Sequence, residues 1–144
     1  MTDYDLTLKN GHLMDPAAGI DAPHDLSFRD GALVAMDAPG NARETRDLAG
    51  CIVTPGLIDL HSHVYWGGTS LGIDPDAYGR ASAVATCIDT GSAGPGNFAG
   101  FRAHVIERSD IRVLAYLHVS HAGIYVFSKR VMMGESEYIR LMEP

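Results

Sequence analysis

Short segments of alternating polar and apolar residues, separated by turn residues, fill the first fifty positions. Segment 4–9 alternates in this way, and 25–29 and 32–37 are further short strand-like segments. A period of two residues is typical of strands that are buried on one face. An Asn-Gly or Asp-Gly pair between such segments favours a tight hairpin turn. The pattern therefore predicts a small β-domain, with hairpin turns at Asn10-Gly11 and Asp30-Gly31.

After Pro55-Gly56 the pattern changes to short apolar segments that alternate with helical ones. Asp74-Pro75 has the chemistry of a helix start, and segment 98–108 carries apolar residues near helical spacing. Strands that are separated by helices imply a parallel sheet. The predicted strands are 57–60, 83–89 and 112–120, and a further helix is predicted over 135–142.

The first of these strands runs into His61-Ser62-His63. Side chains alternate across a strand, so two histidines separated by one residue point to the same face and can reach one ion. Such a pair alone is more often solvated than a ligand pair, and here the buried strand before it favours a metal site. Asp59 would share that face. It would act there either as a solvated strand-end carboxylate or as a group that orients an imidazole.

Two runs carry a resemblance to a known family: VTPGLIDLHSH at 53–63 and TCIDTGSAG at 86–94. They resemble the amidohydrolase superfamily, and within it the dihydroorotase-like amidohydrolase and deacetylase branch. The resemblance implies an α/β fold, with a small β-sandwich portion over residues 1–54. The first three βα units of a metal-dependent hydrolase TIM-type barrel would follow over 55–144, truncated there. His61 and His63 would bind the metal.

The resemblance also implies an activity. It is the hydrolysis of an amide, N-acyl, cyclic amide or ester bond by a metal-bound hydroxide, with one or two ions of Zn²⁺ or another divalent metal. Two histidines do not suffice to hold an ion, which needs three or more protein ligands. The family takes the others from later strands, and a whole barrel needs about 250 residues. The alternative is therefore a catalytically incompetent fragment or an interaction module.

Strand ends and histidines elsewhere leave further alternatives open. Parallel α/β barrels carry their sites at the C-terminal ends of the strands, which would bring Asp89 and His121 to the same rim as the histidine pair. The glycine-rich segment 91–96 would either offer backbone N–H groups to a substrate or form a plain turn, and we favour the turn. None of the other histidines is assigned as a ligand, and catalytic residues stay unassigned.

Composition narrows the range of partners. With 46% hydrophobic and 20% charged residues the chain has the composition of a soluble globular protein, and its net charge of −7 disfavours nucleic acid. No apolar run reaches the roughly 20 residues of a membrane span, so we expect a cytoplasmic chain without a membrane partner. The expected partner is a small-molecule amide or ester, with homo-oligomers or self-association as a further possibility. Cys51 and Cys87 are predicted to be buried free thiols.

Overall fold

A computed structural model of the chain describes residues 3–124. The chain divides into two compact units, Met1–Pro55 (unit 1) and Gly56–Pro144 (unit 2). The helix predicted over 135–142 lies outside the described residues. That residues 1–54 and 55–144 are a β-sandwich portion and the start of a barrel stays a prediction.

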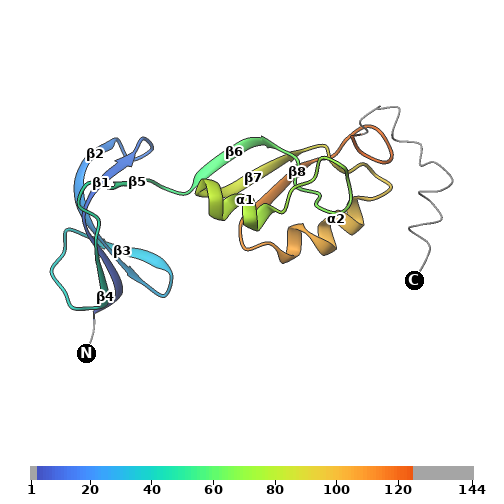
Figure 1. Ribbon diagram of the computed structural model, residues 1–144. Coiled ribbons are helices and arrows are strands. Elements are labelled where there is room, and N and C mark those ends of the chain that lie inside the picture. Colours follow the sequence, from blue (N-terminus) through green and yellow to red (C-terminus); the bar gives the residue numbers. More distant parts are fainter. Residues whose placement is uncertain (1–2, 125–144) are drawn as a thin grey trace. The chain divides into compact units, whose positions relative to one another are not determined.

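Unit 1 contains one five-stranded sheet, whose strands are labelled in Figure 1. Strand β1 is central: it pairs antiparallel with β2 and parallel with β4 and β5, while β3 extends the sheet beyond β2. That this sheet is part of a β-sandwich stays a prediction. The strands are β1 (Tyr4–Asp15), β2 (Ile20–Arg29), β3 (Ala32–Met36), β4 (Ala42–Asp47) and β5 (Ile52–Val53).

The prediction of a hairpin turn at Asn10-Gly11 is wrong, because β1 runs through both residues. Asn10 has a φ of 61°, and the pairing with β2 shifts register between Leu8 and Gly11. One residue in the left-handed region within a strand makes a β-bulge, which keeps the strand in the sheet. Two carboxylates hold the bulge: Asp25 accepts from the Asn10 backbone N–H, and Asp47 accepts from its side-chain amide.

The turns that do join β1, β2 and β3 have different chemistry. Between β1 and β2, the Asp15 carboxylate accepts hydrogen bonds from the backbone N–H groups of Ala17 and Ala18. Between β2 and β3, Asp30 and Gly31 have φ values of 52° and 77°. Two successive positive φ angles define a type I′ turn, so the hairpin predicted at Asp30-Gly31 is confirmed.

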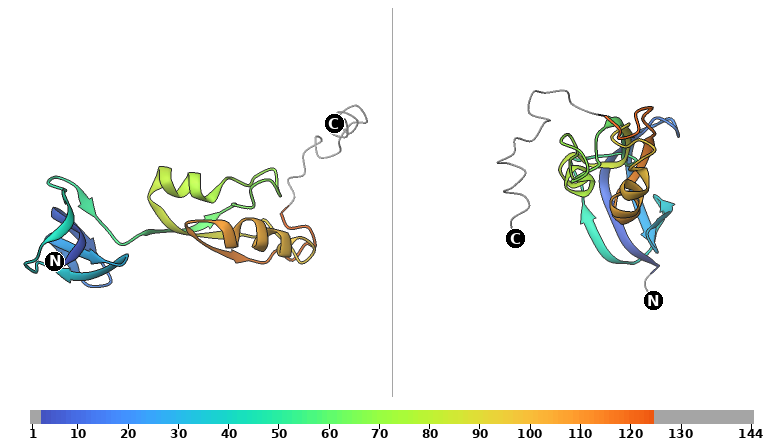
Figure 2. Two further views of the ribbon diagram at one scale, coloured as in Figure 1. Left: turned by 90° about the horizontal axis from the view of Figure 1, so that it is seen from below. Right: turned by 90° about the vertical axis from the view of Figure 1, so that its right-hand side faces the viewer.

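The described residues of unit 2 form a three-stranded parallel sheet with the order β6-β7-β8. Helix α1 connects β6 to β7, and α2 with a short 3₁₀ turn, η1, connects β7 to β8, as Figures 1 and 2 show. The prediction of an α/β chain with parallel strands is confirmed; that it begins a TIM-type barrel stays a prediction. The elements are β6 (Leu57–Ser62), α1 (Pro75–Ser82), β7 (Val84–Thr90), α2 (Phe98–His104), η1 (Ile106–Arg108) and β8 (Arg112–Tyr116).

The two faces of this sheet differ in burial. One face forms the core of unit 2, in which Phe101 of α2 packs with Cys87 of β7 and Val113 of β8. On β6 and β8, by contrast, Ile58, Leu60 and Tyr116 are 62%, 68% and 64% exposed. Among residues 3–124 no helix has the length and apolar character that a membrane span requires.

The two cysteines have different environments. Cys87 is fully buried in the core, as predicted, and burial raises the pKa of its thiol. Cys51 is exposed, so the prediction of a second buried thiol is wrong. Cys51 lies in the turn before the two-residue strand β5, outside the core, and its backbone N–H bonds to the Leu48 carbonyl.

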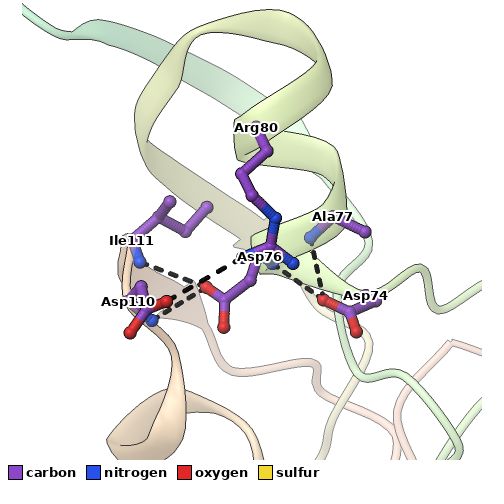
Figure 3. Close-up of polar contacts among 6 residues, drawn as sticks. All are labelled: Asp74, Asp76, Ala77, Arg80, Asp110 and Ile111. Atoms are coloured by element: carbon purple, nitrogen blue, oxygen red, sulfur yellow. Dashed lines mark hydrogen bonds and ion pairs between the residues drawn. The ribbon is translucent and has the colours of Figure 1, made fainter.

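Helix α1 begins as Asp74-Pro75 predicts. The Asp74 carboxylate accepts from the backbone N–H groups of Asp76 (2.9 Å) and Ala77 (3.0 Å), which a helix start otherwise leaves unpaired (Figure 3). The Asp76 carboxylate points away from the helix and accepts from the backbone N–H groups of Asp110 and Ile111 (Figure 3). The first turn of α1 thereby fixes the segment that leads into β8.

Replacing Asp74 by Ala is expected to destabilise unit 2 by about 1 kcal/mol, because the two N–H groups lose their acceptor. Urea unfolding followed by the fluorescence of Trp66, the one tryptophan of the chain, measures this loss. Arg80→Ala on the same helix is the control, since Arg80 makes only a 3.9 Å exposed ion pair with Asp110. Equal effects of the two substitutions would contradict the capping role.

Candidate metal centre

The two histidines singled out by the sequence lie at the C-terminal end of β6. His61 is the next-to-last residue of the strand, and His63 follows its last residue. Their ring centroids are 5.7 Å apart, and the ring planes are nearly perpendicular, at 85°. His61 is exposed and His63 is half-buried. The structure thus brings the two imidazoles together at one strand end, while their role as metal ligands stays a prediction.

Asp59 does not orient an imidazole. One carboxylate oxygen accepts from the backbone N–H of His61 (3.0 Å), and the other accepts from the Tyr78 hydroxyl of α1 (2.7 Å). The pairing of β6 with β7 shifts register between Asp59 and Ser62, and a bulge of this kind interrupts simple alternation. The N–H of His61, and next the Tyr78 hydroxyl, hold the pKa of Asp59 below its usual value. Asp59 therefore serves to join β6 to α1.

His63 has a different side-chain partner, which the sequence did not indicate. Its Nδ1 lies 3.0 Å from the Oγ of Ser92, in the loop after β7. Ser92 is completely buried. Because 29 residues separate the two along the chain, no local pattern predicts this contact. The only sequence signal is the position of Ser92 just after the end of a predicted strand.

A buried carboxylate connects the loop of Ser92 to the end of β6. Asp89 has no exposed surface, and its Oδ1 accepts from the backbone N–H groups of Ser92 (2.7 Å) and Gly91 (3.1 Å). Its Oδ2 accepts from the backbone N–H of Val64 (2.8 Å), the residue after His63. Asp89 thus lies at the expected strand end, and it binds the backbone of the residue after His63 and that of the loop after β7.

The glycine-rich segment 91–96 is a plain turn rather than a donor site for a substrate. Besides the two N–H groups bound by Asp89, the N–H of Gly94 bonds to the Asn97 side chain and that of Gly96 to the His121 carbonyl. These four donors are used within the protein. For these four N–H groups, the plain turn favoured from the sequence is confirmed.

Of the remaining histidines, only His118 and His121 lie near this turn. The Nδ1 of His118 accepts from the backbone N–H of Ser120 (2.9 Å), and His121 is exposed. Within residues 3–124, no three His, Cys, Asp or Glu side chains are grouped so that they could hold a metal ion. The described part of the chain therefore provides two candidate ligands and no third.

The donor chemistry of this pair fits a divalent ion such as Zn²⁺, for which imidazole nitrogens are common ligands. The contact with Ser92 occupies the Nδ1 of His63, so Nε2 is the nitrogen of this ring that remains for a metal. His61 and His63 are the residues that would hold the ion.

Comparisons with known proteins give a consistent result. No family model matches the chain. A deacetylase of Agrobacterium fabrum is 40% identical over 90 residues, and one of Brucella anthropi is 39% identical over 100 residues. These alignments cover 62% and 67% of this chain but only 22% and 25% of the two relatives. The chain therefore spans about a quarter of the curated relatives it matches.

A solved structure of a dihydroorotase is similar to this chain with a TM-score of 0.73 and 33% sequence identity. The similarity covers 83% of this chain and 32% of the dihydroorotase. The family resemblance carried by the runs at 53–63 and 86–94 is thereby confirmed. Over the part that matches these relatives, the chain belongs to the amidohydrolase superfamily.

Proposed function

We propose that this chain carries the first part of the metal site of a hydrolase that cleaves a C–N bond, in an amide, N-acyl or cyclic amide group, or an ester bond. The observation that carries the proposal is the pair of adjacent imidazoles of His61 and His63 at the end of β6. Relatives named deacetylases and a dihydroorotase with the same fold support a hydrolase that acts on amide bonds. The proposed substrate is a small molecule.

The proposed metal is Zn²⁺ or another divalent ion, one or two in number. When bound, such an ion polarises a scissile carbonyl and lowers the pKa of a water molecule. The protein's own contribution at this end of β6 is to hold the ligands. The half-buried ring of His63 contacts Ser92 through Nδ1, and the exposed ring of His61 leaves one side open to solvent and substrate. Further ligands would come from outside residues 3–124.

Titration of the chain with Zn²⁺ tests the metal site. Calorimetry should detect weak binding, because two imidazoles are fewer than the three protein ligands that hold an ion firmly. His61→Gln and His63→Gln should each weaken it at least about tenfold, or about 1.4 kcal/mol, because each removes one imidazole ligand. His104→Gln is the matched control, since His104 is an exposed histidine of α2. Binding that neither substitution at the end of β6 affects would contradict the proposed ligands.

The second candidate is a non-catalytic fragment or interaction module, and two observations favour it. The described residues supply no third ligand, and within them Ile58, Leu60 and Tyr116 are exposed on the edge strands of the β6-β7-β8 sheet. Exposed apolar surface of this kind favours self-association. Size-exclusion chromatography and an assay of N-acyl amino acid hydrolysis in the presence of Zn²⁺ separate the candidates. If the monomeric chain hydrolyses the substrate and His63→Gln abolishes this hydrolysis, the non-catalytic fragment or interaction module is ruled out.

A further inference from the structure

We infer that Ser92 is a positioning residue for His63: its Oγ accepts a hydrogen bond from Nδ1–H and so leaves the Nε2 lone pair free for a cation. The inference rests on the proposed metal site, of which it specifies one ligand atom. It concerns the contact between Nδ1 and Oγ, which are 3.0 Å apart. Neither strand β6, which ends one residue before His63, nor the spacing of the two histidines determines which ring nitrogen faces the site.

The first step of the argument is the rigidity of the partner. Ser92 is completely buried, and its backbone N–H donates to the buried carboxylate of Asp89 at 2.7 Å. The same carboxylate accepts from the backbone N–H of Val64, one residue beyond His63. A single buried group therefore fixes both the backbone that carries the Ser92 hydroxyl and the backbone beside the imidazole. The contact between His63 Nδ1 and Ser92 Oγ therefore joins two segments whose backbones are both bound by Asp89.

The second step is the packing around that loop. Gly91 has a φ of +96°, and a Cβ at this position would lie 3.1 Å from the Cδ2 of His118. The loop before Ser92 is therefore closed against the segment after β8. Together with its burial and its bond to Asp89, this packing holds the Ser92 backbone in place.

The third step is chemical. A neutral imidazole has one N–H and one lone pair, and the hydrogen bond made by one nitrogen decides which form is present. A hydroxyl that accepts from Nδ1–H selects the tautomer whose Nε2 is a ligand, as outer partners of metal-bound histidines do. A hydroxyl that instead donates to Nδ1 selects the Nε2–H tautomer, which has no lone pair left for an ion. Ser92 thus controls whether His63 can bind a metal through Nε2.

The tautomer can be measured directly, without a metal. The chain is labelled with ¹⁵N-histidine, and long-range ¹H–¹⁵N spectra are recorded at a pH where the imidazoles are neutral; His63→Gln identifies the signals. We expect wild-type His63 to be mainly the Nδ1–H tautomer, and Ser92→Ala to shift it toward the Nε2–H form that free histidine favours in water. Ser92→Thr keeps the hydroxyl and should keep the wild-type tautomer.

Ser82→Ala is the matched control, because it removes a half-buried hydroxyl of the same unit that bonds to the Tyr78 carbonyl. It should leave the His63 signals unchanged. An Nε2–H majority in wild-type His63, or the same tautomer in wild type and Ser92→Ala, would overturn the inference. The wild-type measurement decides the question even if a substitution at the buried Ser92 prevents folding.

A second measurement separates this inference from the proposed function. Titration with Zn²⁺, read from the His61 and His63 signals, should show about 10–100-fold weaker binding in Ser92→Ala. Zinc bound equally well by Ser92→Ala and wild type would overturn the positioning role. If Zn²⁺ leaves both histidines unaffected, the proposed metal site is wrong, whereas the tautomer in wild type and Ser92→Ala still decides the role of Ser92.

Discussion

Replacing Asp89 by Asn is expected to destabilise unit 2 by about 3 kcal/mol, although the two side chains have the same shape. The Asp89 carboxylate accepts three backbone hydrogen bonds with no exposure to water. Asparagine has one oxygen and one NH₂ group. Its NH₂ must therefore face either the N–H of Val64 or the N–H groups of Gly91 and Ser92. At least one buried donor is then left without an acceptor, and the charge that strengthens the remaining bonds is lost.

Urea unfolding monitored through Trp66 measures this change, and Asp110→Asn provides the control. Asp110 is exposed, and its carboxylate has only the distant ion pair with Arg80, so the control should change stability by less than about 0.5 kcal/mol. A loss below about 1 kcal/mol for Asp89→Asn would show that other contacts hold the loop. The result bears on function too, because the same carboxylate holds the backbone beside His63.

Substitution of Gly94 by Ala should cost about 3 kcal/mol or prevent unit 2 from folding. Gly94 is buried in the turn after β7. An added Cβ would overlap the carbonyl oxygen of Ser120 and lie 2.7 Å from the backbone nitrogen of Gly123. Because both are backbone atoms, no rotation of a side chain relieves the overlap. The segment after β8 would have to move away from the loop that carries Ser92.

Gly100→Ala is the comparison for this experiment. Gly100 lies within α2, and a Cβ there would meet the Tyr65 hydroxyl oxygen at 3.1 Å, the end of a side chain that can shift. Alanine also has a higher helix propensity than glycine. The free energy of unfolding of this variant should therefore stay within about 1 kcal/mol of wild type. Comparable stability of the Gly94 and Gly100 variants in urea would show that the turn tolerates a side chain and that its closure against Ser120 is loose.

Local chemistry predicted the turns and caps that depend on few residues. Asp30-Gly31 and Asp74-Pro75 determine their own conformations, and both predictions are confirmed. Asn10-Gly11 has equally strong turn chemistry, yet β1 continues through it because β2 pairs with one side of the strand and β4 and β5 pair with the other. The pairing partners lie far along the chain, so a local pattern cannot reveal that the pair forms a bulge.

The same limit applies at the strand ends and at the candidate site. The strand predicted over 112–120 ends at Tyr116, since the N–H of His118 bonds to the Ala93 carbonyl in the loop after β7. The helix predicted over 98–108 divides at Val105 into α2 and η1. The spacing and the strand before it pointed to His61 and His63, although Ile58 and Leu60 of that strand are exposed and not buried as predicted. No local pattern revealed that Asp59 bonds to the His61 backbone N–H and to Tyr78 of α1.

The pairing of β5 with β1 has a consequence for the order of assembly on the ribosome. The antiparallel hairpins of β1, β2 and β3 join near neighbours, so they can form as soon as the nascent chain has emerged as far as Met36. The parallel partners β4 and β5 complete this sheet only when Val53 has emerged as well, four residues before β6 begins. The nascent N-terminal sheet can thus reach its full hydrogen bonding before β6, which ends beside His63, has emerged.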